Sequence, residues 1–237
     1  MISRCFGIDD LGQYGLNWLK NNFLGDILQN RDININLDRK LLKTNSHKEY
    51  ISDKELNQYR FIHPYMYKRK MTDEVIEIFD IGYDITNKAL TFPIQDENGN
   101  CLFIARRSVN YKYFNYPNSA IKPLYGIYQL KKYAPKDLNE IIICESMINC
   151  LTVWVYGKFA IALNGTGSVS QLEELIKLPY RKIILALDPD EAGENGTMKI
   201  FNKLKNHKLV TKLIIPKGKD INDLSKEEFD NLQEVFI

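Results

Sequence analysis

The sequence predicts an α/β fold, in which a parallel-sheet domain follows a smaller α+β subdomain. Three short apolar runs, at 141–144, 183–187 and 213–215, are each followed by acidic residues. Runs rich in Ile and Leu and bounded by turn residues are typical of strands buried on both faces of a parallel sheet. Segments with helical patterns separate the runs, as expected for βαβ units.

The acidic residues after these runs form the candidate site. Ligands of open α/β sheets bind beyond the carboxyl ends of the strands, so acids that follow neighbouring strands should meet there. The acids in question are Glu145, Asp188, Asp190 and Asp220, with Asp223 close by. Crowded carboxylates repel one another unless a cation lies among them, and hard oxygen ligands favour Mg²⁺ or Mn²⁺.

Composition narrows the class of protein. With 237 residues, 44% of them hydrophobic and 26% charged, the chain can form one large or two small packed domains. A net charge of +2 does not by itself indicate a nucleic-acid partner. There is no apolar run of about 18 residues and no secretory signal, so we expect a cytoplasmic protein without a membrane partner. The four cysteines lack C-x-x-C spacing and indicate reduced thiols.

The amino-terminal part is expected to comprise a segment and linker, 1–52, before a subdomain at 53–135 and the parallel-sheet domain at 136–237. Residues 12–19 read as a short amphipathic helix, and the polar stretch 26–52 as a linker or loosely packed strand. A capping box at Ser52 predicts a helix to about residue 59. Thr72 is expected to cap a second helix that ends at Gly82.

The subdomain should contain a β-hairpin followed by a basic, aromatic stretch. The runs 89–94 and 101–105 flank Asn98-Gly99, which is a strong hairpin signal. Arg107 follows the second strand, and residues 111–118 interleave tyrosines with a lysine. Such a stretch is suited to contacts with phosphates and nucleobases.

The carboxyl-terminal domain is expected to alternate regularly between strands and helices. We predict helices over 146–156, 169–178 and 191–206, strands over 159–163, 182–187 and 210–215, and a last helix that starts at a capping box on Ser225.

The acidic motifs resemble the Toprim domain shared by bacterial-type DNA primases, topoisomerases and some nucleases. That family has a Glu after its first core strand and Asp-x-Asp after a later one, which match Glu145 and Asp188-Pro189-Asp190. This chain departs from the family at two positions. The first motif usually reads Glu-Gly-x-x-Asp but ends here on Asn149, and Asn222 stands where primases often have a further acid. Asp223 lies next to that position and is expected to take its place.

A second resemblance, ahead of the Toprim-like part, is to bacterial-type and phage-type primases. These have a Phe-Pro-Ile hairpin, an Arg, a Lys-Tyr motif and Leu-Tyr-Gly-Leu in that order. The corresponding elements here are Phe92-Pro93-Ile94, Arg107, the segment 112–117 and Leu124-Tyr125-Gly126-Ile127. The two resemblances together cover about residues 54–235. Residues 12–19 also resemble the segment after the zinc ribbon of some phage-type primases, although the ribbon itself is not seen.

The resemblance implies roles for the candidate residues. Glu145, Asp188 and Asp190 are expected to be catalytic, and these three with Asp220 and Asp223 to bind the metal. Contacts to nucleotide or template are expected from Arg107, Lys112, Lys122, Tyr113 and Asn115. The plainer alternatives are a turn or helix cap for the acids and an exposed basic loop for the cations.

The implied function is the RNA-polymerising core of a DNA primase, a nucleotidyltransferase of DNA replication. Its partners would be single-stranded DNA, ribonucleoside triphosphates, a replicative helicase and a separate zinc-binding module. Two alternatives stay open. A Toprim nuclease would leave the primase-like hairpin and basic motif unexplained, and a non-catalytic DNA-binding or partner-binding module would account for Ser146 and Asn149.

Overall fold

A computed structural model describes residues 17, 50–111, 114–115 and 122–237. The chain divides into two compact units, 1–49 and 50–237, and the named helices and strands lie in the second. The predicted helix at 12–19 and most of the predicted linker lie outside the described residues. No helix in the described part of the chain is long and apolar enough to cross a membrane.

The first part of this unit is a small α+β subdomain, as predicted. It contains three short helices and a four-stranded antiparallel sheet in the order β1-β2-β3-β4. The helices are α3 (Asp53–Asn57), α4 (Pro64–Lys68) and α5 (Asp73–Ile78), and the strands are β1 (Gly82–Asp84), β2 (Ala89–Gln95), β3 (Cys101–Ser108) and β4 (Phe114–Asn115). The predicted hairpin is confirmed: β2 pairs with β3 around a turn in which Gly99 has φ of 88°.

The helix caps of the subdomain follow the sequence, but the end of α5 does not. Ser52 and Thr72 accept hydrogen bonds from the main chain of the first turns of α3 and α5. The prediction that Gly82 ends the second helix is wrong, because α5 ends at Ile78 and Gly82 begins β1. A Cβ at Gly82 would lie 1.9 Å from the Tyr59 carbonyl oxygen, so close packing of two backbones explains this glycine.

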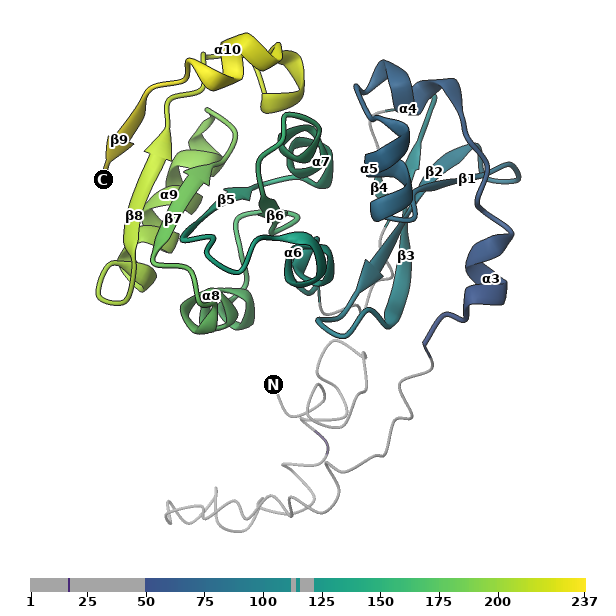
Figure 1. Cartoon of the computed structure of the whole chain (residues 1–237), viewed down its shortest axis with the longest axis horizontal. Coiled ribbons are helices and arrows are strands. Elements are labelled where there is room, and N and C mark those ends of the chain that lie inside the picture. Colours follow the sequence, from purple (N-terminus) through teal and green to yellow (C-terminus); the bar gives the residue numbers. More distant parts are fainter. Residues whose placement is uncertain (1–16, 18–49, 112–113, 116–121) are drawn as a thin grey trace. The chain divides into compact units, whose positions relative to one another are not determined.

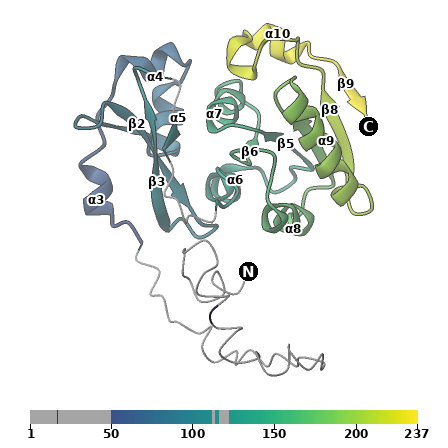
Figure 2. The same cartoon turned by 180° about the vertical axis from the view of Figure 1, so that it is seen from behind.

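The second part is the predicted α/β domain. Its five-stranded sheet has the order β6-β5-β7-β8-β9, in which the first four strands are parallel and β9 is antiparallel. The strands are β5 (Glu140–Cys144), β6 (Ala160–Ala162), β7 (Lys182–Ala186), β8 (Leu209–Leu213) and β9 (Glu234–Phe236); the helices are α6 (Ile127–Tyr133), α7 (Met147–Val155), α8 (Val169–Lys177), α9 (Glu191–Leu204), η2 (Ile221–Asp223) and α10 (Lys226–Asp230). Both sheets are visible in Figure 1 and, from behind, in Figure 2.

The two central strands of the sheet are buried, as their apolar runs predict, whereas the predicted run 213–215 begins at the last residue of β8 and contains the exposed Ile214. Residues 141–144 of β5 and 183–186 of β7 are all buried. Full burial of one such Ile or Leu side chain contributes about 1.5–3 kcal/mol, so these two strands anchor the domain. The first sheet spans residues 82–115 and the second spans 140–236, so the predicted domain boundary between 135 and 136 lies between them. The position of this boundary stays a prediction.

Aromatic side chains join the two sheets into one core. Phe79, at the end of α5, packs edge-on against Trp154 of α7, with ring centroids 5.2 Å apart. It also contacts Tyr125, whose main chain bridges to Ala162 of β6. In both views α5 and α7 lie between the two sheets (Figures 1 and 2). The subdomain therefore packs directly on the helix that follows Glu145.

Candidate active site

Glu145 and Asp188 leave neighbouring parallel strands at the same edge of the sheet. The last residue of β5, Cys144, pairs with the last residue of β7, Ala186. Glu145 is the next residue after Cys144, and Asp188 is two residues after Ala186. The register therefore brings the two acids together, as the sequence predicted, at the edge where α/β sheets bind ligands.

The surroundings of Glu145 disfavour the ionised form of its carboxyl group. Its Oε2 atom is buried and has no hydrogen-bond partner among the described residues. Burial raises the pKa of this carboxyl above its usual 4.5, and the negative charges of Asp188 and Asp190 raise it further, while a hydrogen bond from the Asp188 main chain opposes them. Desolvation and like charges both disfavour the ionised form. A cation at this edge would relieve both effects.

Asp190 is an exposed helix cap as well as a member of this acidic group. Its Oδ1 accepts a hydrogen bond of 2.8 Å from the Gly193 N–H and caps α9. The predicted alternative, that this acid caps a helix, is thus confirmed. Capping uses one carboxylate oxygen and leaves the other for another role. A Cβ at Gly193 would lie 2.0 Å from the Asp188 carbonyl oxygen. Glycine at this position therefore lets the first turn of α9 close onto the acidic turn.

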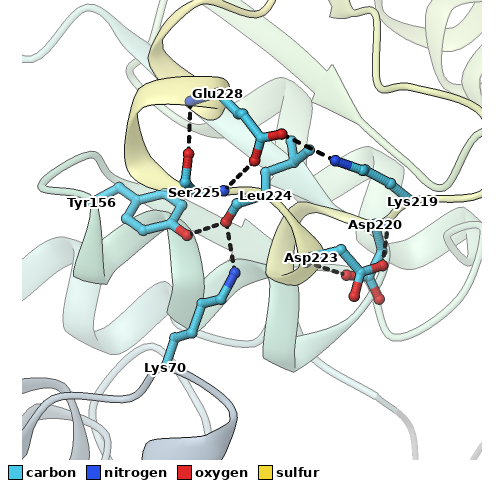
Figure 3. Close-up of polar contacts among 8 residues, drawn as sticks. All are labelled: Lys70, Tyr156, Lys219, Asp220, Asp223, Leu224, Ser225 and Glu228. Atoms are coloured by element: carbon cyan, nitrogen blue, oxygen red, sulfur yellow. Dashed lines mark hydrogen bonds and ion pairs between the residues drawn. The ribbon is translucent and has the colours of Figure 1, made fainter.

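Asp220 and Asp223 bond mainly to each other. Asp220 Oδ1 accepts from the Asp223 N–H at 3.0 Å, and Asp223 Oδ2 accepts from the Asp220 N–H at 2.9 Å. This reciprocal box begins η2 and is drawn in Figure 3. Within the described residues, no group of three or more His, Cys, Asp or Glu side chains is close enough to hold a metal ion. The structure does not gather the five predicted ligands into a finished metal site.

The two positions where this chain departs from the Toprim pattern are buried and polar. Asn149, on α7, donates a hydrogen bond from Nδ2 to Asp188 Oδ1 at 3.1 Å. Asn222, on η2, donates from its main-chain N–H to Asn149 Oδ1 at 3.3 Å. Sequence reasoning missed this contact with Asp188. The one signal for it is the i, i+3 spacing of Asn149 and Thr152, which places two polar groups on the same face of an otherwise apolar helix.

The predicted basic residues have different surroundings. Arg107 is only 5% exposed. Its Nη1 donates a hydrogen bond to the Tyr65 hydroxyl, and its guanidinium carbon lies over the Tyr65 ring, 5.4 Å from the ring centroid. This burial argues against the predicted direct contact with a phosphate. Asn115 lies in β4 opposite Arg106. Lys112 and Tyr113 lie outside the described residues.

Lys122 lines a cavity beside Glu145. The cavity has a volume of about 570 Å³ and is lined by Lys122 and by residues of the loop 163–171. Lys122 Nζ lies 3.4 Å from the Asn164 carbonyl oxygen, and the Gly165 N–H donates to the Glu145 carbonyl oxygen at 3.1 Å. Both polar atoms of the Asn164 side chain are buried and have no partner among the described residues. A lysine and a buried, unpartnered amide therefore lie next to the acidic edge.

Comparisons of sequence and of structure with known proteins agree with one another. A family profile described as Toprim-like matches residues 142–225, which contain the acidic edge. The DNA primase of Buchnera aphidicola subsp. Acyrthosiphon pisum is 28% identical over 158 residues, which are 62% of this chain and 27% of that protein. The chain therefore spans about a quarter of the length of this relative.

Two solved primase structures share the fold. The DnaG primase catalytic domain bound to single-stranded DNA aligns with a TM-score of 0.63 and 21% identity, over 76% of this chain and 75% of that one. The primase fragment of the bacteriophage T7 primase-helicase protein aligns with a TM-score of 0.53 and 22% identity, over 73% and 72% of the two chains. At this level of identity the likeness concerns the fold.

The fold and the acidic edge define a Toprim-like domain preceded by an α+β subdomain. The chain is similar in sequence to bacterial DNA primases, and its fold is similar to that of a DnaG catalytic core.

The Toprim-like domain and the primase-type fold imply dependence on a divalent metal ion. The residues at the edge fit such an ion in chemistry and charge. Glu145 supplies a buried carboxylate oxygen without a partner, and Asp188 and Asp190 add like charge close to it. Carboxylate oxygens are the ligands that hard divalent cations prefer.

Removing the charge of Glu145 should stabilise the metal-free protein. The pKa of this carboxyl is raised in the folded state, so the folded protein binds the proton more tightly than the unfolded chain does. The stability gained from this proton is fully present below pH 4.5 and is lost as the pH rises through the folded pKa. We therefore expect Glu145→Gln to raise the Tm in EDTA at pH 7 by about 2–4 °C, as for a gain of about 1 kcal/mol. Thermal unfolding between pH 4 and 8 measures this.

The matched control is Glu173→Gln, an exposed residue of α8. It should leave both the Tm and its pH dependence unchanged. Adding Mg²⁺ should raise the Tm of the parent more than that of Glu145→Gln. A Glu145→Gln protein that is less stable than the parent in EDTA at pH 7 would show that the ionised carboxyl does not destabilise the folded state.

Proposed function

We propose that this chain is the RNA-polymerising core of a DNA primase. It would join ribonucleotides on a single-stranded DNA template and release pyrophosphate, with Mg²⁺ or Mn²⁺ as the cofactor. The observation that carries the proposal is the convergence of Glu145 with Asp188 and Asp190 at the carboxyl edge of a Toprim-like sheet. The preceding hairpin and Arg107 follow the order expected of primases and favour this reaction over strand cleavage.

The acidic residues take distinct roles in this proposal. Glu145, Asp188 and Asp190 would hold the cation, and Asp220 and Asp223 would complete its surroundings once their mutual hydrogen bonds rearrange. The cation supplies positive charge against the triphosphate and the developing charge of phosphoryl transfer. Glu145, which follows β5 at this edge, would organise the metal or exchange a proton near the 3′-hydroxyl of the primer.

The cavity at Lys122 is the proposed position of nucleotide or template. A lysine on its wall can contact a phosphate, and the unpartnered Asn164 amide can bond a base or sugar. These contacts would continue along the single-stranded DNA through ionic and stacking interactions with Lys112, Tyr113 and Asn115. Arg107 is buried against Tyr65 and would stabilise the α+β subdomain rather than bind a phosphate directly.

Removing Lys122 should weaken binding of single-stranded DNA in a salt-dependent way. One lost phosphate contact makes the slope of log K against log salt shallower by about 0.7. Fluorescence anisotropy of Lys122→Ala with a labelled oligonucleotide, at several salt concentrations, measures this slope. Lys136→Ala is the control, because Lys136 is exposed and precedes β5 at the opposite edge of the sheet. Equal slopes for Lys122→Ala and the parent would remove Lys122 from the proposed site.

One assay separates the proposed function from its two alternatives. The chain is incubated with labelled ribonucleotides, Mn²⁺ and a mixed single-stranded template. Short RNA products support the primase core, a cut template supports a nuclease, and retained binding without either product supports a non-catalytic module. Asp188→Asn and Asp137→Asn serve as the site variant and the remote control, because Asp137 is an exposed acid that precedes β5.

A zinc-binding module and a replicative helicase are the proposed protein partners. The described cysteines, Cys101, Cys144 and Cys150, are all buried. Burial raises the pKa of each thiol, which disfavours the thiolate form that binds zinc. We therefore propose that a separate module supplies template recognition. Adding one should raise initiation on bare template more than extension of an annealed RNA primer.

A further inference from the structure

Asn149 occupies a buried position between the acidic edge and the turn that carries Asp220. Its residue exposure is 1%, and it lies on α7 one turn before Thr152. The side chain has two hydrogen-bond partners, Asp188 Oδ1 at 3.1 Å and the Asn222 N–H at 3.3 Å. An amide can serve both, because it has a donor nitrogen and an acceptor oxygen.

The chemistry of the neighbours fixes which way this amide points. The main-chain N–H of Asn222 can only donate, so the oxygen of Asn149 must face it. The NH₂ group of Asn149 then faces Asp188, where a carboxylate oxygen accepts. A flipped amide would place oxygen against carboxylate and NH₂ against N–H. The hydrogen-bonding pattern therefore requires Asn149 to donate to Asp188.

The turn that holds Asn149 is itself fixed from two sides. Asn222 Nδ2 donates to Thr152 Oγ1 at 2.8 Å and to the Arg69 carbonyl oxygen, after α4, at 2.9 Å. Two residues on, the Leu224 carbonyl oxygen accepts from Lys70 Nζ at 2.7 Å and from the Tyr156 hydroxyl. Figure 3 shows Lys70 and Tyr156 both pointing at this oxygen. The Asn222 N–H, which donates to Asn149, is therefore part of a rigid turn.

We propose that Asn149 is a positioning residue, whose buried amide orients the Asp188 carboxylate for the metal ion and is itself oriented by the Asn222 turn. This inference rests on the proposed function. A carboxylate at position 149 could still accept from Asn222, but it would place a second negative charge against Asp188 in place of a hydrogen-bond donor. The neutral amide thus holds Asp188 in place before a cation arrives.

The test is Mn²⁺ binding, measured from the free-ion signal in electron paramagnetic resonance. Asn149→Ala should weaken Mn²⁺ binding about 10- to 100-fold, as is typical when a residue that orients a metal ligand is removed. Gln129→Ala is the matched control. It removes a buried amide that hydrogen bonds to Gln95 and to the Ile78 carbonyl oxygen and contacts neither Asp188 nor the Asn222 turn, so it should lose stability but keep the Mn²⁺ affinity within about twofold.

Asn149→Asp provides a second variant of nearly equal shape. The added charge next to Asp188 should tighten Mn²⁺ binding and lower the Tm measured in EDTA. Unchanged Mn²⁺ affinity in both Asn149 variants would overturn the positioning role, even if the parent makes RNA. Equal losses of Mn²⁺ affinity in Asn149→Ala and Gln129→Ala would also overturn it, because they would indicate a structural effect alone. A parent that binds Mn²⁺ but makes no RNA would reject the proposed function and leave the role of Asn149 standing.

Discussion

Asp188→Asn is expected to reduce RNA synthesis about 100- to 1000-fold while leaving the fold intact. A bound cation contributes several kcal/mol to the transition state of phosphoryl transfer, and each 1.36 kcal/mol is tenfold in rate. The substituted amide keeps the size of the side chain and an oxygen that can accept from Asn149, but it loses the charge that holds a hard cation.

Primer synthesis and thermal unfolding should be measured on the same preparation. The Tm of Asp188→Asn in EDTA should lie within a few degrees of the parent, because the hydrogen bond to Asn149 survives. Asp137→Asn should match the parent in both measurements. Metal-dependent synthesis at the parental rate by a folded Asp188→Asn protein would remove Asp188 from the catalytic site.

The strands and their acids could be predicted because the signals are local. Residues 141–144 and 183–187 are apolar for the length of a strand, and an acid follows each within two residues. The observed register of β5 with β7 then brings Glu145 and Asp188 to one edge. Caps at Ser52, Thr72 and Ser225 were predictable for the same reason, since each lies three residues before the N–H that it bonds.

What could not be predicted depends on contacts between distant parts of the chain. Asn149 and Asp188 are 39 residues apart, and the polar face that Asn149 shares with Thr152 does not indicate which distant residue it bonds. Arg107 follows a strand as an accessible base would, yet Tyr65, 42 residues earlier, buries it. The short edge strand β9 also escaped prediction, since residues 234–236 are largely exposed and lack the apolar run of a buried strand.

Gly193→Ala is expected to be the most damaging single-methyl change in the described part of the acidic site. The new Cβ would lie 2.0 Å from the Asp188 carbonyl oxygen and 3.2 Å from its nitrogen. Both atoms belong to the backbone, so no change of rotamer relieves the overlap. The first turn of α9 must then move away from Asp188, which also breaks the hydrogen bond from the Gly193 N–H to Asp190.

The sign of this effect is informative because helix propensity acts in the opposite direction. Alanine is favoured over glycine inside a helix by about 1 kcal/mol, so Gly193→Ala would stabilise α9 if the site were open. Overpacking and loss of the cap should outweigh this gain and leave a net destabilisation of roughly 1–3 kcal/mol. For a chain of this size the Tm should fall by about 2–4 °C for each kcal/mol.

Gly196→Ala is the matched control, one turn further along the same helix. Its Cβ would lie 3.0 Å from side-chain atoms of Leu187 and Thr166, which can move where the backbone cannot. Thermal unfolding in EDTA and the Mn²⁺ affinity should both be measured. Gly193→Ala should lose stability and Mn²⁺ affinity together, because the clash displaces the turn that carries Asp188 and Asp190, whereas Gly196→Ala should be affected less in both. If Gly193→Ala is as stable as the parent and binds Mn²⁺ equally well, then α9 does not approach Asp188 this closely, and the geometry of the acidic edge must be different.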